Sequence, residues 1–326
     1  MSDSSAFHLW WKMPGDAIED IKTFVPNPHG TTTFHFSPFD KAQGNPALRV
    51  RGNALPVSFP LNAELSLESS PEVPDIKKED HLSAVNSALA DINGGELKKV
   101  VISRSEFWST PLTPEELFRS KCEMYPDAMV YLLAHPDVGV WLGASPELLL
   151  QRIGGEFETV SLAGTKSSLT EPWTDKERRE QEMVTDFITH RLRATGAQGV
   201  AQRRARDRTY GTIKHLESKI VFSSDQNDDA LLEELHPTPA VGGEPRDHAL
   251  RFIAKHEKQN RAYYTGFLGW SQEAEANYFV NLRCMQCFSN GFRLFAGGGI
   301  VKGSDALAEW EETRAKIETI RTNLKR

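Results

Sequence analysis

Cysteine is scarce in this sequence, with Cys122, Cys284 and Cys287 as its three examples among 326 residues. So few thiols do not form a disulfide framework and are typical of a protein in a reducing compartment. Cys284 and Cys287 have the C-x-x-C spacing of redox and zinc motifs, but their segment "NYFVNLRCMQCF" predicts a buried strand. A three-residue separation places two thiols on opposite faces of a strand. We therefore expect no redox or zinc chemistry there.

The sequence also lacks long apolar runs and an excess of positive charge. No run approaches the roughly 20 apolar residues of a membrane-spanning helix. The N-terminus has no basic stretch followed by an apolar core, so we expect no secretory leader. With 38 Lys and Arg against 45 Asp and Glu, the net charge is -7, which argues against nucleic acid as a partner. These absences favour a cytoplasmic protein without a membrane or nucleic-acid partner.

Strand and helix signals alternate irregularly along the chain. Strand signals lie in short apolar patches before residue 80 and in later segments such as "KKVVISRSEFW", "YFVNLRCMQCF" and "FRLFAGGGIV". Helical patterns cover 81–93, 113–125, 174–195, 228–235, 245–261 and the chain from about Ser304 onward. Frequent hairpins without a regular βαβ repeat favour an α+β fold with large, mostly antiparallel sheets flanked by helices.

Two of the expected helices carry carboxylates beside their apolar faces. Glu177 and Glu180 lie one turn apart in helix 174–195, and Glu309 and Glu312 are three residues apart in the final helix. Acids on an apolar face are costly unless a cation compensates them. Either pair alone is also compatible with a solvated helix edge. Together they offer four carboxylates to one hard divalent cation, and Mg²⁺ prefers such oxygen ligands.

Three other charged residues lie in apolar surroundings. Lys99 begins the strand segment "KVVISR", Glu147 follows a Ser-Pro corner in "GASPELLL", and Arg283 lies inside "VNLRC". A lysine at a strand start and an acid in a turn are usually solvated. Lys99 and Glu147 are therefore either solvated surface residues or catalytic residues. Desolvation would raise the pKa of Glu147 and favour a proton donor. A charged Arg283 requires either a protein acid or a substrate carboxylate.

Seven segments resemble, in order, the motifs of the chorismate-utilising enzymes: "KVVISR", "GASPELLL", "LAGT", "DKERREQEMVTDFI", "HPTPAVGGEP", "VNLRC" and "AGGGIVKGSDALAEWEETRAK". This family includes isochorismate synthases, salicylate synthases and the synthase subunits of anthranilate and aminodeoxychorismate synthase. The resemblance covers roughly 85–320, whereas 1–80 match little. It implies the fold of anthranilate synthase component I, with 1–80 as the N-terminal part of the sheet and 81–326 as the chorismate-binding catalytic region of one structural domain.

Within this family the sequence is most similar to isochorismate synthases. Members that use water carry a lysine where Lys99 stands, and "LHPTPAVGGEP" resembles the isochorismate synthase form of that segment. Gln181 departs from the pattern, because many relatives have His there. The resemblance implies an Mg²⁺-dependent isomerase that converts chorismate to isochorismate, for menaquinone or siderophore biosynthesis. A salicylate synthase, an ammonia-using synthase subunit and a catalytically silent chorismate-binding module are the alternatives. We expect a monomer without a glutaminase subunit.

The resemblance also implies roles for individual residues. Lys99 is the general base that activates water, and Glu147 is the general acid that protonates the departing hydroxyl. The metal-binding residues are Glu180 and Glu312, with Glu177 and Glu309 supporting the water shell of the ion. The residues that contact the substrate are Gly164, Thr165, His215, Arg283, Gly297 and Lys316. The glycines of "AGGGIVKG" then let backbone amides approach a substrate carboxylate, with Mg²⁺ between that carboxylate and the acids that follow.

Overall fold

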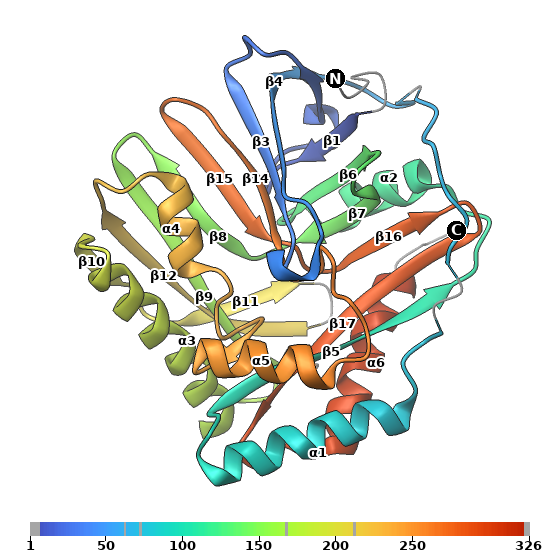
Figure 1. The fold of residues 1–326 in the computed structure, drawn as a ribbon. Coiled ribbons are helices and arrows are strands. Elements are labelled where there is room, and N and C mark those ends of the chain that lie inside the picture. The colour runs from blue at the N-terminus through green and yellow to red at the C-terminus, as the bar shows by residue number, and fades with distance from the viewer. Residues whose placement is uncertain (1–6, 62, 72–73, 167–168, 211–212, 323–326) are drawn as a thin grey trace.

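The computed structural model describes residues 7–61, 63–71, 74–166, 169–210 and 213–322 (Figure 1). Its α-helices are α1 (Lys78–Gly94), α2 (Pro114–Met124), α3 (Asp175–Ala194), α4 (Asp228–Leu235), α5 (Arg246–His256) and α6 (Ala306–Thr322). Its strands are β1 (His8–Lys12), β2 (Lys22–Pro26), β3 (Thr32–Ser37), β4 (Leu48–Pro56), β5 (Lys99–Trp108), β6 (Met129–His135), β7 (Gly139–Ser145), β8 (Leu148–Ile153), β9 (Glu156–Lys166), β10 (Gln198–Gln202), β11 (Arg206–Tyr210), β12 (Ile213–Ser223), β13 (Gly243–Glu244), β14 (Phe267–Ser271), β15 (Glu275–Val280), β16 (Cys284–Phe288) and β17 (Gly291–Val301).

Antiparallel pairing joins these strands into one hydrogen-bonded network of 17 strands. The longest ladders join β5 to β17 and β9 to β12. Near the N-terminus, β1 pairs with β6 and β3 pairs with β14, so strands distant in sequence lie side by side. The predicted α+β fold with large antiparallel sheets is confirmed.

Local sequence signals explain several helix boundaries. Thr113 accepts a hydrogen bond from the Glu116 amide, and the Glu116 side chain accepts one in return, which forms a capping box before Pro114. Helix α1 ends where Gly95 adopts a left-handed conformation with φ 83°. At the start of α6 the Asp305 side chain accepts a hydrogen bond of 2.8 Å from the Ala308 amide.

Two sequence predictions of single elements were wrong. The segment "YFVNLRCMQCF" forms two strands, because the chain turns at 281–283 and Arg283 has a φ of 48°. The buried Asn281 side chain stabilises this corner by bonding the Tyr131 hydroxyl at 2.7 Å and the Tyr263 carbonyl at 2.8 Å. The helix predicted over 245–261 ends at His256, after which Glu257 is extended.

Helices α3 and α6 pack against different parts of the sheet. Helix α3 lies beside β9 and β12, where Val184 and Ile188 share an apolar core with Ile220, and α6 lies beside β17 (Figure 1). Both helices border the same pocket. None of the helices in the described ranges combines the length and apolarity that crossing a lipid bilayer requires. All three cysteines are buried and free.

Candidate active site

A pocket of about 660 Å³ brings the predicted site residues together. Strands β5, β9, β12 and β17 line it, as do helices α3 and α6 and the 281–283 corner. Every predicted site residue except Thr165 lines this pocket. Thr165 pairs with His215 across the β9–β12 ladder, and its side chain lies outside the described part of the structure. Residues separated by more than 200 positions therefore share one cavity.

Lys99 begins β5 and is almost completely buried, with a relative exposure of 1%. Its backbone lies between two strands, paired with Val301 of β17 and with Glu244 of β13. Its ammonium group donates a hydrogen bond of 2.6 Å to Glu180 Oε1. Lys99 is thus a pocket residue rather than a solvated lysine at a strand start.

Glu147 lies at the corner between β7 and β8 and is also buried, which excludes the solvated turn acid that the sequence left open. The corner is fixed because the Val280 amide of β15 donates to the Glu147 carbonyl at 3.0 Å. Burial raises the pKa of Glu147 to about 8, although the positive charge of Lys99 acts in the opposite direction. The carboxyl group is therefore mainly protonated at neutral pH and can donate a proton.

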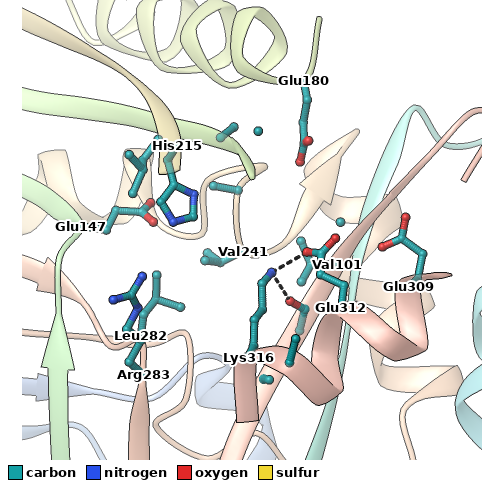
Figure 2. A pocket seen from close by; sticks show the side chains of 18 of the residues that line it. Val101, Glu147, Glu180, His215, Val241, Leu282, Arg283, Glu309, Glu312 and Lys316 are labelled. Carbon is teal, nitrogen blue, oxygen red and sulfur yellow. Dashed lines mark hydrogen bonds and ion pairs between the residues drawn. The ribbon is translucent and has the colours of Figure 1, made fainter. Parts of the chain in front are cut away.

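The four helix carboxylates point into the pocket from two sides. Glu177 and Glu180 come from α3, whereas Glu309 and Glu312 come from α6 (Figure 2). Each is paired with a lysine: the pairs are Lys99–Glu180 at 2.6 Å, Lys316–Glu312 at 2.7 Å, Lys176–Glu309 at 3.7 Å and Lys166–Glu177 at 3.8 Å. Among the described residues, no three His, Cys, Asp or Glu side chains gather closely enough to hold a metal ion. The predicted four-carboxylate cluster is therefore not assembled in this arrangement.

The donor set nevertheless fits a hard divalent cation. Burial raises the pKa of Glu309, and the negative charge of Glu312 raises it further, so these two carboxylates repel each other. A cation between them would relieve that repulsion. Lys176, which balances Glu309, can change partner, since its side chain is 47% exposed and ends in the pocket. Carboxylate oxygens from two facing helices are suitable ligands for Mg²⁺.

Two cations, Arg283 and Lys316, also line the pocket, and Lys316 lies one turn after Glu312 on α6 and pairs with it at 2.7 Å. Arg283 projects from the 281–283 corner, and Lys316 donates a hydrogen bond of 2.8 Å to the Gly297 carbonyl (Figure 2). Burial lowers the pKa of His215 to about 3, with smaller contributions from the charges of Arg283 and Lys316. His215 is therefore neutral. A neutral donor beside two cations suits an anionic ligand that carries hydroxyl groups.

The consecutive glycines lie within β17 rather than in a loop, and they leave room for the side chains of the site. A Cβ added at Gly299 would lie 2.9 Å from Glu180 Oε1 and 3.0 Å from Lys99 Cε. At Gly298 it would lie 3.0 Å from Glu309 Oε2. Any larger residue would push Lys99 and the helix acids apart. The glycines therefore allow Lys99 and the helix acids to meet over one strand.

Sequence reasoning missed the apolar walls and some of the charges. Val101, Val241 and Thr265 line the pocket, as do Lys166 and Lys176. Val101 could have been found, because it lies on the same strand face as Lys99. Val241 and Thr265 lie in loops, Lys176 lies in the first turn of α3 and Lys166 ends β9, so no shared periodic pattern indicated them. The positions of these residues in the pocket depend on contacts between segments that are distant in the sequence.

Comparisons with known proteins agree with this site. The sequence model of the family described as "Chorismate binding enzyme" matches residues 58–325. Isochorismate synthase MenF of Escherichia coli (strain K12) is 32% identical over 254 residues, which cover 74% of this chain and 59% of that protein. Isochorismate synthase EntC of the same strain is 35% identical over 198 residues, covering 56% of this chain and 51% of that protein. The matched part of the chain thus spans a little more than half of either relative.

Solved structures share the fold over nearly the whole chain. The menaquinone-specific isochorismate synthase MenF from Escherichia coli has a TM-score of 0.82 at 24% identity, covering 99% of this chain and 90% of that chain. Anthranilate synthase component I from Streptococcus pneumoniae TIGR4 has a TM-score of 0.72 at 17% identity, covering 98% and 93%. The fold predicted from the motifs is therefore confirmed. With a family match over residues 58–325, the chain belongs to the chorismate-binding enzymes.

Proposed function

We propose that the protein is an Mg²⁺-dependent isochorismate synthase that converts chorismate to isochorismate. One observation above all supports this reaction: Lys99 and the protonated Glu147 are both buried in one pocket. Water addition with loss of a hydroxyl requires one group that removes a proton and another that supplies one. The relatives named as isochorismate synthases support the choice of this reaction within the family.

Lys99 would act as the general base. As water attacks C2 of chorismate, its proton passes to the lysine amine, the two double bonds of the ring each shift by one position, from C1=C2 to C1=C6 and from C5=C6 to C4=C5, and the C4–oxygen bond breaks. Lys99 Nζ lies 2.6 Å from Glu180 Oε1. For the amine to take a proton from water, this ion pair has to open so that Lys99 can face the substrate.

Glu147 would act as the general acid. Its carboxyl group protonates the departing C4 hydroxyl, which leaves as water. One water enters and one leaves, so substrate and product are isomers and no electrons are exchanged. A positioned acid and a positioned base each typically contribute about 10²–10⁴-fold to the rate.

The remaining residues would bind and orient the substrate. Glu180 and Glu312 would hold Mg²⁺, with Glu177 and Glu309 beside it. When bound, Mg²⁺ neutralises the ring carboxylate of chorismate. Arg283 and Gly297 would bind the pyruvyl carboxylate, because a guanidinium group matches a carboxylate in two parallel hydrogen bonds. Gly164, Thr165, His215 and Lys316 would complete the substrate-binding site.

A product assay tests the function directly. The purified protein is incubated with chorismate, with and without Mg²⁺, and the products are separated by chromatography. We expect isochorismate to form only with Mg²⁺ and without glutamine or ammonia. Salicylate and pyruvate as the main products would identify a salicylate synthase instead. An aminated product that depends on ammonia would indicate a synthase subunit, and binding without turnover would refute an enzymatic role.

A further inference from the structure

A buried ion pair lies behind the pocket wall, in the segment that follows α5. The Arg261 guanidinium donates to both oxygens of Glu257, at 2.8 and 2.6 Å. Their side chains are 1% and 2% exposed, respectively. Burying two charges is favourable only when their other hydrogen-bonding groups are also satisfied. The partners of those groups therefore indicate what the pair does.

The remaining donors of Arg261 all reach residues that line the pocket. They bond the Val101 carbonyl at 2.7 Å, the Val241 carbonyl at 2.8 Å and Thr265 Oγ1 at 3.2 Å. With the two bonds to Glu257, all five N–H groups of the guanidinium have an acceptor. One side chain thus joins three segments of the pocket wall that lie more than 20 residues apart in the sequence.

Glu257, the acidic partner in the ion pair, also bonds β5, two residues after the Val101 carbonyl that Arg261 contacts. Its carboxylate accepts hydrogen bonds from the Ser103 amide at 2.6 Å and from the Ser103 hydroxyl at 3.0 Å. The short strand β13 pairs with β5 only at Lys99 and Val100, and the Val101 amide bonds the Gly242 carbonyl. Beyond that point the ion pair takes the place of a neighbouring strand. It satisfies the edge of β5 at the Val101 carbonyl and the Ser103 amide, two to four residues after Lys99.

We propose that Arg261 and Glu257 are positioning residues for the reaction. They hold β5, and with it Lys99, in register with the wall formed by Val241 and Thr265. The distance between the base and the substrate ring depends on this register. The inference deepens the proposed function, on which it rests for the choice of reaction, and neither residue touches the substrate.

A second ion pair provides a matched control for a merely structural role. Arg152 donates to both oxygens of Asp228, at 2.7 and 3.0 Å, and to the carbonyls of Gln272 and Glu273, at 3.0 and 2.9 Å. None of these residues lines the pocket. Replacing either arginine by lysine removes a bidentate contact and bonds to two carbonyls. Only the change at Arg261 affects the pocket wall.

The experiment compares Arg261→Lys with Arg152→Lys at a temperature where circular dichroism shows both to be folded. We expect Arg261→Lys to lower kcat for chorismate at least ~10-fold, because misplacing a reacting group by about 1 Å can cost ~10²-fold. Its Mg²⁺ affinity, measured by calorimetry, should stay within about 2-fold of wild type, since other elements carry the helix acids. Arg152→Lys should lower Tm and leave kcat and KM unchanged.

The proposal would be overturned if kcat fell equally in Arg261→Lys and Arg152→Lys. A folded Arg261→Lys variant with wild-type kcat would overturn it as well. If Arg261→Lys does not fold, Ser103→Ala replaces it, because that change removes the hydroxyl contacts with Glu257 and Gln259 and keeps the bond from the Ser103 amide to Glu257. A 2- to 5-fold fall in kcat at unchanged Mg²⁺ affinity is then expected, and an unchanged kcat contradicts the proposal. If the wild type makes no isochorismate, the proposed function fails separately. Chorismate affinity then replaces kcat, and it must fall in Arg261→Lys but not in Arg152→Lys.

Discussion

The two walls of the pocket differ in how firmly they hold their charged groups. On the strand wall, Lys99 and Glu147 have relative exposures of 1% and 4%, and hydrogen bonds to neighbouring strands fix their backbones. On the helix wall, the Glu312 side chain is 40% exposed, and Lys176, which faces Glu309, is 47% exposed. The strand wall is rigid and dry. On the helix wall Glu309 is also buried, but Glu312 and Lys176 reach solvent, so the Lys316–Glu312 and Lys176–Glu309 pairs can exchange.

This difference matches two kinds of chemistry. Proton transfer requires a base and an acid at fixed distances and with shifted pKa values, which burial on a sheet provides. Binding a hydrated cation requires carboxylates that can change partners. A solvated ion pair contributes little to stability. A carboxylate can therefore exchange its lysine partner for Mg²⁺ at little cost in free energy. We infer that catalysis belongs to the strand wall and metal binding to the helix wall.

The largest effect is expected from Lys99→Ala. Without the proposed base, turnover should fall by at least ~10²–10⁴-fold. Chorismate should still bind, because Arg283 and Lys316 remain in the pocket. Steady-state kinetics and calorimetry measure the two quantities. The matched control is Lys98→Ala, because Lys98 is exposed on the preceding position and should keep normal activity. Near-normal turnover in Lys99→Ala would show that the strand wall does not provide the base.

Glu147→Gln should have the next largest effect, a fall of about 10²-fold or more in kcat at neutral pH. Since the reaction needs the protonated carboxyl group, wild-type kcat should fall as the pH rises above about 8, the raised pKa of this group. Glutamine cannot lose a proton, so the variant should lack that decline. A pH–rate profile that is identical in the two proteins would rule out Glu147 as the acid.

The same carboxyl group affects stability with a defined sign. Its pKa rises from 4.5 in the unfolded chain to about 8 in the folded protein. Its contribution to folding is therefore fully present below pH 4.5 and is lost as the pH rises through 8. The free energy of unfolding of the wild type should fall over this window relative to Glu147→Gln, as urea titrations can show. Parallel pH dependences would indicate that Glu147 is ionised in the folded protein.

The sequence predicted the composition of both walls but not their difference. The ordered motifs identified Lys99, Glu147 and the helix acids because each lies in a short recognisable segment. Burial of Glu147 was not predictable, since it depends on the Val280 amide, more than 130 residues away. The strand predicted through Arg283 was wrong because the buried Asn281 turns the chain. Lys316 lies one turn after its partner Glu312 on α6, but the other three lysine partners come from a different element than their acid, so no local pattern indicated them.

On the helix wall, Glu312→Gln should weaken Mg²⁺ binding at least ~10-fold. Replacing a residue that only supports a metal ligand already costs about 10- to 100-fold in affinity, so the loss of a ligand should cost at least the lower of these values. The loss of activity should be recovered in part at high Mg²⁺ concentration, which distinguishes it from Glu147→Gln. Calorimetric titration with Mg²⁺ measures the affinity. Glu318→Gln is the control, because Glu318 lies on the same helix and outside the pocket. An unchanged titration in Glu312→Gln would contradict its assignment as a ligand.

The smallest effect is expected from Gln181→Ala, which tests how α3 is held in place. The buried Gln181 amide donates to the hydroxyl groups of Ser161 on β9 and Ser218 on β12, at 3.0 and 2.9 Å. Its loss leaves buried hydroxyls with fewer partners, so the free energy of unfolding should fall by about 2 kcal/mol.

Because the strand wall holds Lys99 and Glu147 independently of this network, kcat at saturating Mg²⁺ should change less than about 2-fold in Gln181→Ala. Urea unfolding and steady-state kinetics on the same preparation measure both quantities. Gln181 follows Glu180 directly, so a loosened α3 should raise only the Mg²⁺ concentration needed for half-maximal activity. A large fall in kcat at unchanged stability would mean that the two walls are coupled, and the division between a rigid catalytic wall and an adaptable metal-binding wall would then be wrong.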